Sequence, residues 1–147
     1  MRIVFTAGLG ITGAITRWAT WGAAGHVAFE LEDGRGRVSY LDATPSLGVA
    51  EHATLAGRIV GRYAVMCSDQ QALDAVRWAS DQIGKPYDWS AIYGMACRRD
   101  RHDPRAWFCS ELIFEAFEVA GFPLLRAEAL DRITPRDLMM SEGLRPV

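Results

Sequence analysis

Up to Cys67, the hydrophobic residues of this chain fall in short runs separated by glycine-rich or charged segments. Runs of this kind are typical of β-strands with turns between them. Residues 32–37 are polar and include Gly34 and Gly36, so they predict a turn that joins the flanking strands into an antiparallel hairpin. The predicted strands cover residues 2–6, 26–31, 38–43 and about 58–67.

The segment from Ile3 to Gly25 is apolar apart from Arg17 and several threonines. Arg17 and the glycines interrupt it, whereas the hydrophobic part of a signal peptide is continuous and a membrane-spanning helix would bury the arginine at a cost of several kcal/mol. We therefore expect this segment to belong to the fold, with a signal peptide as the alternative. It predicts a helix from about 12 to 21, one face of which carries Ile11, Ile15, Trp18 and, as a further candidate, Trp21.

After Cys67 the spacing of the apolar residues becomes helical. Helices are predicted from Ser68 or Asp69 to about Ile83, from Cys109 to Ala120, and from Thr134–Pro135 onward. The second of these is the most regular, because its apolar residues recur at positions i, i+3, i+4, i+7, i+8 and i+11 and form one buried stripe. The whole pattern predicts an α+β fold, in which a small antiparallel sheet packs against helices.

Length and composition narrow the classes of protein to consider. With 147 residues, half of them hydrophobic, the chain can bury a core of its own and is expected to form one domain over residues 1–147. Lys and Arg number 16 and Asp and Glu 18, so the formal charge of −2 lacks the basic excess of proteins that bind nucleic acids or anionic membranes. The three cysteines are odd in number and lack a CxxC spacing, which favours a reduced compartment over a disulfide framework or a zinc site.

Cys109 is the first candidate for chemistry, because the most regular predicted helix begins there. Unpaired N–H groups at a helix N-terminus stabilise an anion, which lowers the pKa of a thiol and raises its thiolate fraction. A cysteine on an apolar helical stripe is more often an ordinary core residue, so this placement alone leaves both interpretations open. Cys67 and Cys97 lack the placement and are expected to be structural.

A nucleophilic cysteine also needs an imidazole to take its proton and a third group to orient the ring. His26 begins a predicted strand and is the best placed of the three histidines, whereas His52 and His102 lie in polar surroundings and are expected on the surface. If the apolar residues of the hairpin face the core, His26 and Asp42 share the other face, where Asp42 could accept a hydrogen bond from the ring. Glu30 shares that face and is expected to be a solvated edge charge. A structural role for His26, and a place at the strand end for Asp42, are the alternatives.

Five short motifs follow one another along most of the chain. They are Gly25-His26-Val27-Ala28, Leu41-Asp42-Ala43-Thr44 with Gly48-Val49, Gly84-Lys85-Pro86-Tyr87-Asp88, Phe108-Cys109-Ser110-Glu111-Leu112 and Thr134-Pro135-Arg136-Asp137-Leu138. Their order and spacing resemble the circularly permuted branch of the NlpC-type papain-like cysteine peptidases, which includes small bacterial and phage-encoded enzymes and is related to the lecithin:retinol acyltransferase-like proteins. In that branch the histidine precedes the cysteine.

The resemblance implies a permuted papain-like fold with the nucleophile at a helix N-terminus. It implies Cys109 as the nucleophile, His26 as general base and then general acid, and Asp42 as the polar third member, although the family position that matches Asp42 is often glutamate. Tyr87 matches a tyrosine of the family's cleft that lines the site or binds the oxyanion, and its alternative role is to cap a short helix. No metal or organic cofactor is implied, because a nucleophile, a base and an orienting group are already present.

The expected function is that of a cysteine hydrolase, a peptidase or amidase that cleaves an amide bond in a peptide or a peptidoglycan stem peptide through a thioester acyl-enzyme. Acyl transfer or lipid ester hydrolysis on the same fold is one alternative, and a non-catalytic binding or assembly module, for example of a phage particle, is another. The expected partner is a peptide, peptidoglycan or acyl substrate, with no nucleic acid and no integral membrane segment, in a cytoplasmic or phage-associated location. The candidate lining of an acyl pocket is Trp18, Trp21, Trp89 and Trp107.

Overall fold

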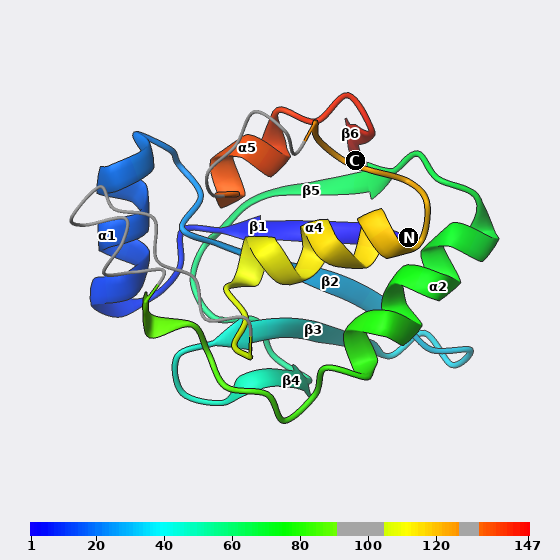
Figure 1. Ribbon diagram of the computed structural model, residues 1–147, viewed down its shortest axis with the longest axis horizontal. Helices are drawn as coiled ribbons and strands as arrows, with labels where there is room; N and C mark the ends of the chain where they lie inside the picture. Colours follow the sequence, from blue (N-terminus) through cyan, green and yellow to red (C-terminus); the bar gives the residue numbers. More distant parts are fainter. Residues whose placement is uncertain (91–104, 127–132) are drawn as a thin grey trace.

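An antiparallel sheet forms the centre of the fold (Figure 1). The computed structural model describes residues 1–90, 105–126 and 133–147, and within these ranges the sheet has six strands in the order β4-β3-β2-β1-β5-β6. Every neighbouring pair is antiparallel. The strands are β1 (Arg2–Thr6), β2 (His26–Glu32), β3 (Val38–Thr44), β4 (Gly48–His52), β5 (Ile59–Val65) and β6 (Leu144–Pro146).

The described helices surround this sheet, with α2 and α4 packed against each other and α1 beyond the end of the strands (Figure 1). They are α1 (Gly10–Thr20), α2 (Asp69–Ser80), α4 (Cys109–Val119) and α5 (Pro135–Met139). The predicted capping residues Ser68 and Thr134 each form a capping box, which satisfies N–H groups that a helix start leaves unpaired. The predicted α+β class is therefore confirmed. No helix among the described residues combines the length and the apolar character needed to cross a membrane.

The hydrophobic core lies between α4 and the sheet. Helix α4 packs across β2 and β3, and the rings of Phe29 and Phe117 lie 5.8 Å apart between them. The predicted stripe is confirmed, because Cys109, Leu112, Ile113, Ala116 and Phe117 are all buried. This packing fixes the start of α4 relative to the sheet.

The chain between β4 and β5 covers the other face of the sheet. β4 is an edge strand and β5 lies beyond β1, so residues 53–58 must pass across β3, β2 and β1. The Ala7 N–H donates to the carbonyl of Arg58 at 2.9 Å, which ties the end of this crossover to the end of β1. On the face of the sheet that points away from α4, Asp42 is 1% exposed.

Glu30 is buried, and the expectation of a solvated edge charge is wrong. β2 lies between β1 and β3, so it is an interior strand. The Glu30 carboxylate is buried and bonds to two guanidinium groups, with Nε of Arg2 at 3.2 Å and Nε of Arg62 at 2.8 Å. Pairing of this kind offsets the cost of burying the carboxylate.

Of the expected apolar face of α1, Ile15 packs against the core and the rest is exposed. Trp18 and Trp21 are exposed, and the helix is instead buried along Gly13 and Thr16. A Cβ at Gly13 would lie 2.9 Å from the carbonyl carbon of Gly8, so the glycine lets the helix approach the preceding loop backbone to backbone. Periodicity identified the helix but not its buried side, because glycine carries no hydrophobic signal.

Candidate active site

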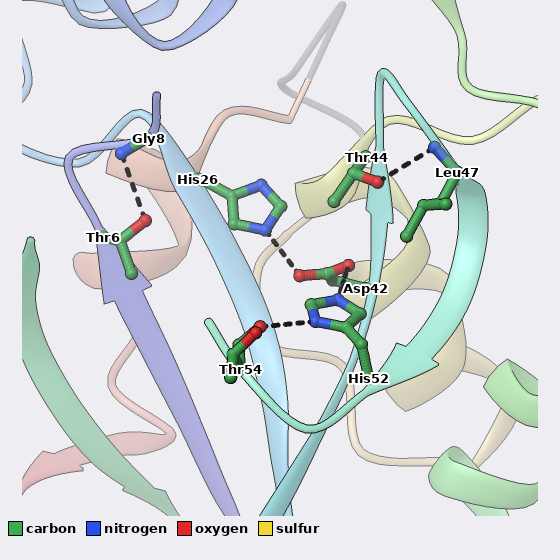
Figure 2. Close-up of polar contacts among 8 residues, drawn as sticks. All are labelled: Thr6, Gly8, His26, Asp42, Thr44, Leu47, His52 and Thr54. Carbon is green, nitrogen blue, oxygen red and sulfur yellow. Dashed lines mark hydrogen bonds and ion pairs between the residues drawn. The ribbon is translucent and has the colours of Figure 1, made fainter. Parts of the chain in front are cut away.

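His26, on β2, and Asp42, on the neighbouring strand β3, lie together near one end of the sheet (Figure 2). The Nε2–H group of His26 donates to Oδ2 of Asp42 at 2.7 Å. The His26 side chain is 12% exposed and that of Asp42 only 1%. The contact predicted from the alternation of the hairpin is therefore confirmed, and Asp42 lies within β3, which continues to Thr44.

Cys109 is the first residue of α4, as predicted, and it is buried. Because Nε2 of His26 is bonded to Asp42, Nδ1 is the nitrogen left to face Cys109, with which His26 shares a side-chain hydrogen bond. Burial lowers the pKa of His26, but the charge of Cys109 and the hydrogen bonds to Asp42 and Cys109 outweigh it and raise the pKa to about 10. The arrangement therefore favours the protonated form of His26.

Tyr87 is held beside Cys109 by a short ladder of backbone hydrogen bonds. Trp107, two residues before Cys109, donates from its N–H to the carbonyl of Pro86 at 3.0 Å and accepts from the N–H of Asp88 at 3.0 Å. The predicted site residues Tyr87 and Cys109 thus lie on two segments that are joined directly. The helix-capping alternative stays open, because residues 89–90 are helical and the Trp89 N–H donates to the Tyr87 carbonyl at 3.1 Å.

The same segment is anchored to the edge of the sheet. The Val49 N–H donates to the carbonyl of Lys85, and the Gly84 N–H donates to the carbonyl of Val49, both at 2.9 Å. A Cβ at Gly48 would lie 2.3 Å from the Lys85 oxygen, so only glycine permits this approach. Two of the five sequence motifs therefore pack on each other.

The phenol of Tyr87 remains protonated in this setting. The residue is buried, and burial, together with the nearby charges of Cys109, Asp88 and Glu111, raises its pKa well above the ordinary value. A phenol held in its neutral form keeps the O–H that donates a hydrogen bond. It can therefore act as a donor to an anion formed next to Cys109.

His52 belongs to the site, and the expectation that it is a solvated surface residue is wrong. Its Nε2 lies 2.9 Å from Oδ1 of Asp42, and its Nδ1 lies 2.7 Å from the carbonyl oxygen of Thr54 (Figure 2). Asp42 thus contacts one imidazole with each carboxylate oxygen. The available signal was alternation along 48–52, which gives His52 the same facing as Asp42 once β4 is recognised as a strand next to β3.

A cavity of about 300 Å³ opens beside His26 and Tyr87. Its rim is tied down by two local bonds, from the Gly8 N–H to Oγ1 of Thr6 and from the Leu47 N–H to Oγ1 of Thr44 (Figure 2). No Asp, Glu, Lys or Arg is found among the described residues that line it. These are Gly8, Leu9, Gly10, Thr12, Gly13, Gly25, His26, Thr44, Pro45, Ser46, Ala56 and Tyr87.

The proposed tryptophan lining of an acyl pocket is wrong for this cavity, since none of the described residues around it is a tryptophan. Trp18, Trp21 and Trp89 are exposed, and Trp107 packs edge-on against Trp78 at 5.2 Å. Two further predictions, a structural Cys97 and a surface His102, lie outside the described residues, whereas Cys67 is half-buried against the core.

The donor groups of this cluster are already engaged with one another. Among the described residues, no group of three or more His, Cys, Asp and Glu side chains is arranged to hold a metal ion. Nε2 of His26 and Nε2 of His52 both carry hydrogens toward Asp42, and a protonated imidazole nitrogen has no lone pair for a metal.

Comparison with known proteins adds information about the fold. No protein-family model matches the chain, and a search of curated proteins finds no match. Among solved structures, the chain is similar to the crystal structure of metalloprotein yiiX from Escherichia coli O157:H7, DUF1105, with a TM-score of 0.75 and 15% sequence identity over 99% of this chain and 94% of that chain. At this identity the similarity concerns the fold, which is of the α+β class.

Proposed function

We propose that this protein is a cysteine hydrolase of the permuted papain-like type, acting on an amide bond in a peptide or a peptidoglycan stem peptide. The observation that carries the proposal is the chain of contacts from Cys109 through His26 to Asp42, with Cys109 at the N-terminus of a helix. Each group has the chemistry that its role requires: a thiol as nucleophile, an imidazole as proton carrier and a buried carboxylate that orients the ring.

The reaction begins with the proton of Cys109 on Nδ1 of His26. The thiolate adds to the substrate carbonyl, and the C–N bond breaks as the imidazolium gives its proton to the departing amine, which leaves a thioester on Cys109. A water molecule then adds to the thioester while His26 takes one of its protons. Collapse of this second adduct releases the carboxylic acid and returns the sulfur to the His26 pair.

His26 changes from acid to base because its surroundings change during turnover. In the resting site, the negative charge of Cys109 is the largest of the effects that raise the His26 pKa. Acylation turns the thiolate into a neutral thioester, so that effect disappears and the pKa of His26 falls. A lower pKa leaves the imidazole unprotonated after the amine departs, which is the form that deprotonates water.

Two donors are available to the oxyanion of the adducts. Cys109 is the first residue of α4, so its N–H has no acceptor within the helix. Tyr87 supplies a neutral phenol next to the same sulfur. Donors placed where negative charge develops stabilise the transition state more than the ground state.

The proposal is tested by replacing Cys109→Ala and, as a matched control, Cys67→Ala, which removes a half-buried thiol next to the core. We expect Cys109→Ala to abolish turnover of peptide and muropeptide substrates while circular dichroism shows an unchanged fold, and Cys67→Ala to keep its activity. Intact mass after brief exposure to iodoacetamide at pH 6 should show one adduct in the wild type and none in Cys109→Ala. An active Cys109→Ala protein would overturn the proposal, and uniform slow labelling of the thiols would favour a binding module.

Acyl transfer or ester hydrolysis is the second candidate, favoured by the uncharged and largely small-residue lining of the cavity beside His26. Such a lining suits an acyl chain better than the charged groups of a stem peptide. The two functions share Cys109 and His26, so only the substrate separates them. Turnover of a medium-chain lipid ester without turnover of muropeptides would reverse the order of the two candidates.

The description of the Escherichia coli structure as a metalloprotein concerns that protein. Here the His26 and His52 side chains direct N–H groups at the Asp42 carboxylate, and the proposed steps do not pass through a metal ion. We accordingly expect a chelator such as EDTA to leave turnover unchanged.

A further inference from the structure

The hydrogen-bond partners of His52 fix where its protons are. The carbonyl oxygen of Thr54 can only accept, so Nδ1 of His52 carries a hydrogen. Oδ1 of an ionised Asp42 can also only accept, so Nε2 carries a hydrogen as well. With Asp42 ionised, both contacts are satisfied only when His52 is an imidazolium.

Asp42 therefore lies between two rings that both donate to it. Its Oδ2 accepts from His26 at 2.7 Å and its Oδ1 accepts from His52 at 2.9 Å (Figure 2). With Cys109 as thiolate, the four groups carry two negative and two positive charges. This balance is lost if His52 becomes neutral, because its Nε2 would then present a lone pair to the carboxylate.

The remaining groups around His52 leave Asp42 as its main charged partner. On β4, the neighbouring Glu51 points to the other face of the sheet and accepts from Oγ of Ser39 at 2.6 Å. On β3, Tyr40 lies opposite His52 in register, and on β2 the charge of His26 opposes protonation of His52. The crossover contributes only the Thr54 carbonyl, which favours protonation.

We propose that His52 is a positioning residue of the site: as an imidazolium bridging Asp42 and the 53–58 crossover, it holds the carboxylate in place for His26 and lends positive charge to the Cys109–His26 pair. The inference rests on the proposed function. His52 bonds to Asp42 and to the Thr54 carbonyl and is not among the described residues that line the cavity, so it acts through Asp42. His52 also links the 53–58 crossover, through the Thr54 carbonyl, to the Asp42 carboxylate.

The charge of His52 acts on the two titrations of the pair in the same direction. A nearby positive charge favours the thiolate of Cys109, and it disfavours the protonated form of His26. Replacement of His52 by a neutral residue should therefore move both titrations to higher pH. Glutamine is a suitable replacement because its amide still donates hydrogen bonds but does not titrate.

The first experiment measures the protonation of His52 directly. ¹⁵N chemical shifts of the wild-type protein and of Cys109→Ala, recorded against pH and assigned with His52→Gln, should show His52 with both nitrogens protonated and a midpoint above the ordinary value of about 6.5. Burial lowers the pKa of His52, but its bonds to Asp42 and Thr54 raise it overall. A midpoint at or below about 6.5 would overturn the inference.

The second experiment follows the rate of Cys109 alkylation by iodoacetamide against pH in the wild type, His52→Gln and the control Glu51→Gln. We expect the acidic limb of the profile to move up by roughly 0.5 pH unit in His52→Gln and to stay in place in Glu51→Gln. Superimposed profiles would reject the role of His52 while leaving the nucleophile intact. If Cys109 is not selectively alkylated in the wild type, the proposed function fails, and the ¹⁵N titration still decides the state of His52.

Discussion

Asp42 is the central residue of the candidate site, because one buried carboxylate accepts hydrogen bonds from two imidazoles. Aspartate is shorter than glutamate by one methylene group, and at this position its two oxygens lie between β2 and β4. A neutral side chain of the same size keeps the volume but loses the charge that both rings need. The role of the Asp42 charge can therefore be tested without changing the size of the side chain.

For Asp42→Asn we expect kcat to fall roughly 100-fold, because the amide cannot accept from both rings and no longer stabilises the His26 imidazolium. The measurement is steady-state turnover with the best available substrate, together with circular dichroism to verify the fold. Asp74→Asn is the control, since Asp74 is a partly exposed residue of α2 that bonds to Gln70. Equal activities of the two variants would show that Asp42 has a purely structural role.

The raised pKa of His26 predicts a specific pH dependence. Because this pKa is about 10, the imidazolium is present throughout the acidic and neutral range and is lost only as the pH rises through about 10. The wild type should therefore be alkylated at Cys109 at least about tenfold faster than His26→Gln at pH 6, where an ordinary thiol is almost fully protonated. The ratio should shrink toward pH 9, as the thiol of the variant ionises by itself, and a ratio that is constant with pH would contradict the ion pair.

At the scale of residues, the sequence predicted that His26 and Asp42 lie together but did not predict that His52 joins them. The period of two in the hairpin placed His26 and Asp42 on one face without any knowledge of the rest of the fold. His52 escaped because its strand has only five residues and begins at Gly48, so the alternation along it was not recognised as a strand. Its charged partner comes from the neighbouring strand, which local sequence does not reveal.

At the scale of elements, close backbone contacts position the site. Gly25 immediately precedes His26, and its N–H donates to the carbonyl of Thr6 at 2.9 Å. α4 was predictable because its buried face is built from large apolar side chains at helical spacing. The docking of α1 was not, because it relies on glycines, whose contribution is the absence of a side chain.

Gly25→Ala tests this docking. Its Cβ would lie 2.6 Å from the carbonyl oxygen of Ala7 and 2.8 Å from that of Gly13, so the loop or α1 must shift. We expect a loss of roughly 1–3 kcal/mol in the free energy of unfolding, measured with urea, and a lower kcat because His26 moves with the strand start. Gly34→Ala, where the new methyl group meets nothing within 4 Å, should change stability by less than about 1 kcal/mol. Equal stabilities of the two variants would contradict the close contact.

At the scale of the whole molecule, the sheet order brings distant segments to one place. The cavity beside His26 is lined from the β1–α1 loop, the start of β2, the β3–β4 turn, the crossover and the segment at Tyr87. Periodicity supplied most of these elements, but it carries no information on which strands become neighbours. The crossover over three strands follows only from the order β4-β3-β2-β1-β5-β6, and this topology is what buries Asp42.

Cys109, the proposed nucleophile, is not among the described residues that line this cavity, so the two can be changed independently. Ala56 lies at the exposed part of the lining, and a tryptophan there would reduce the volume of the cavity without entering the core. For Ala56→Trp we expect kcat/KM to fall roughly tenfold for 4-nitrophenyl octanoate and much less for the acetate, because only the longer chain needs the filled space.

Alkylation of Cys109 by iodoacetamide serves as the internal reference, and it should stay within about twofold of the wild type because the Cys109–His26 pair is untouched. Ala53→Trp is the matched control, since Ala53 is exposed on the same crossover and is not among the described residues that line the cavity. A parallel loss with both esters would mean that the tryptophan disturbs the catalytic groups. No loss with either ester would mean that the acyl group binds elsewhere, and the cavity would then have no part in substrate selection.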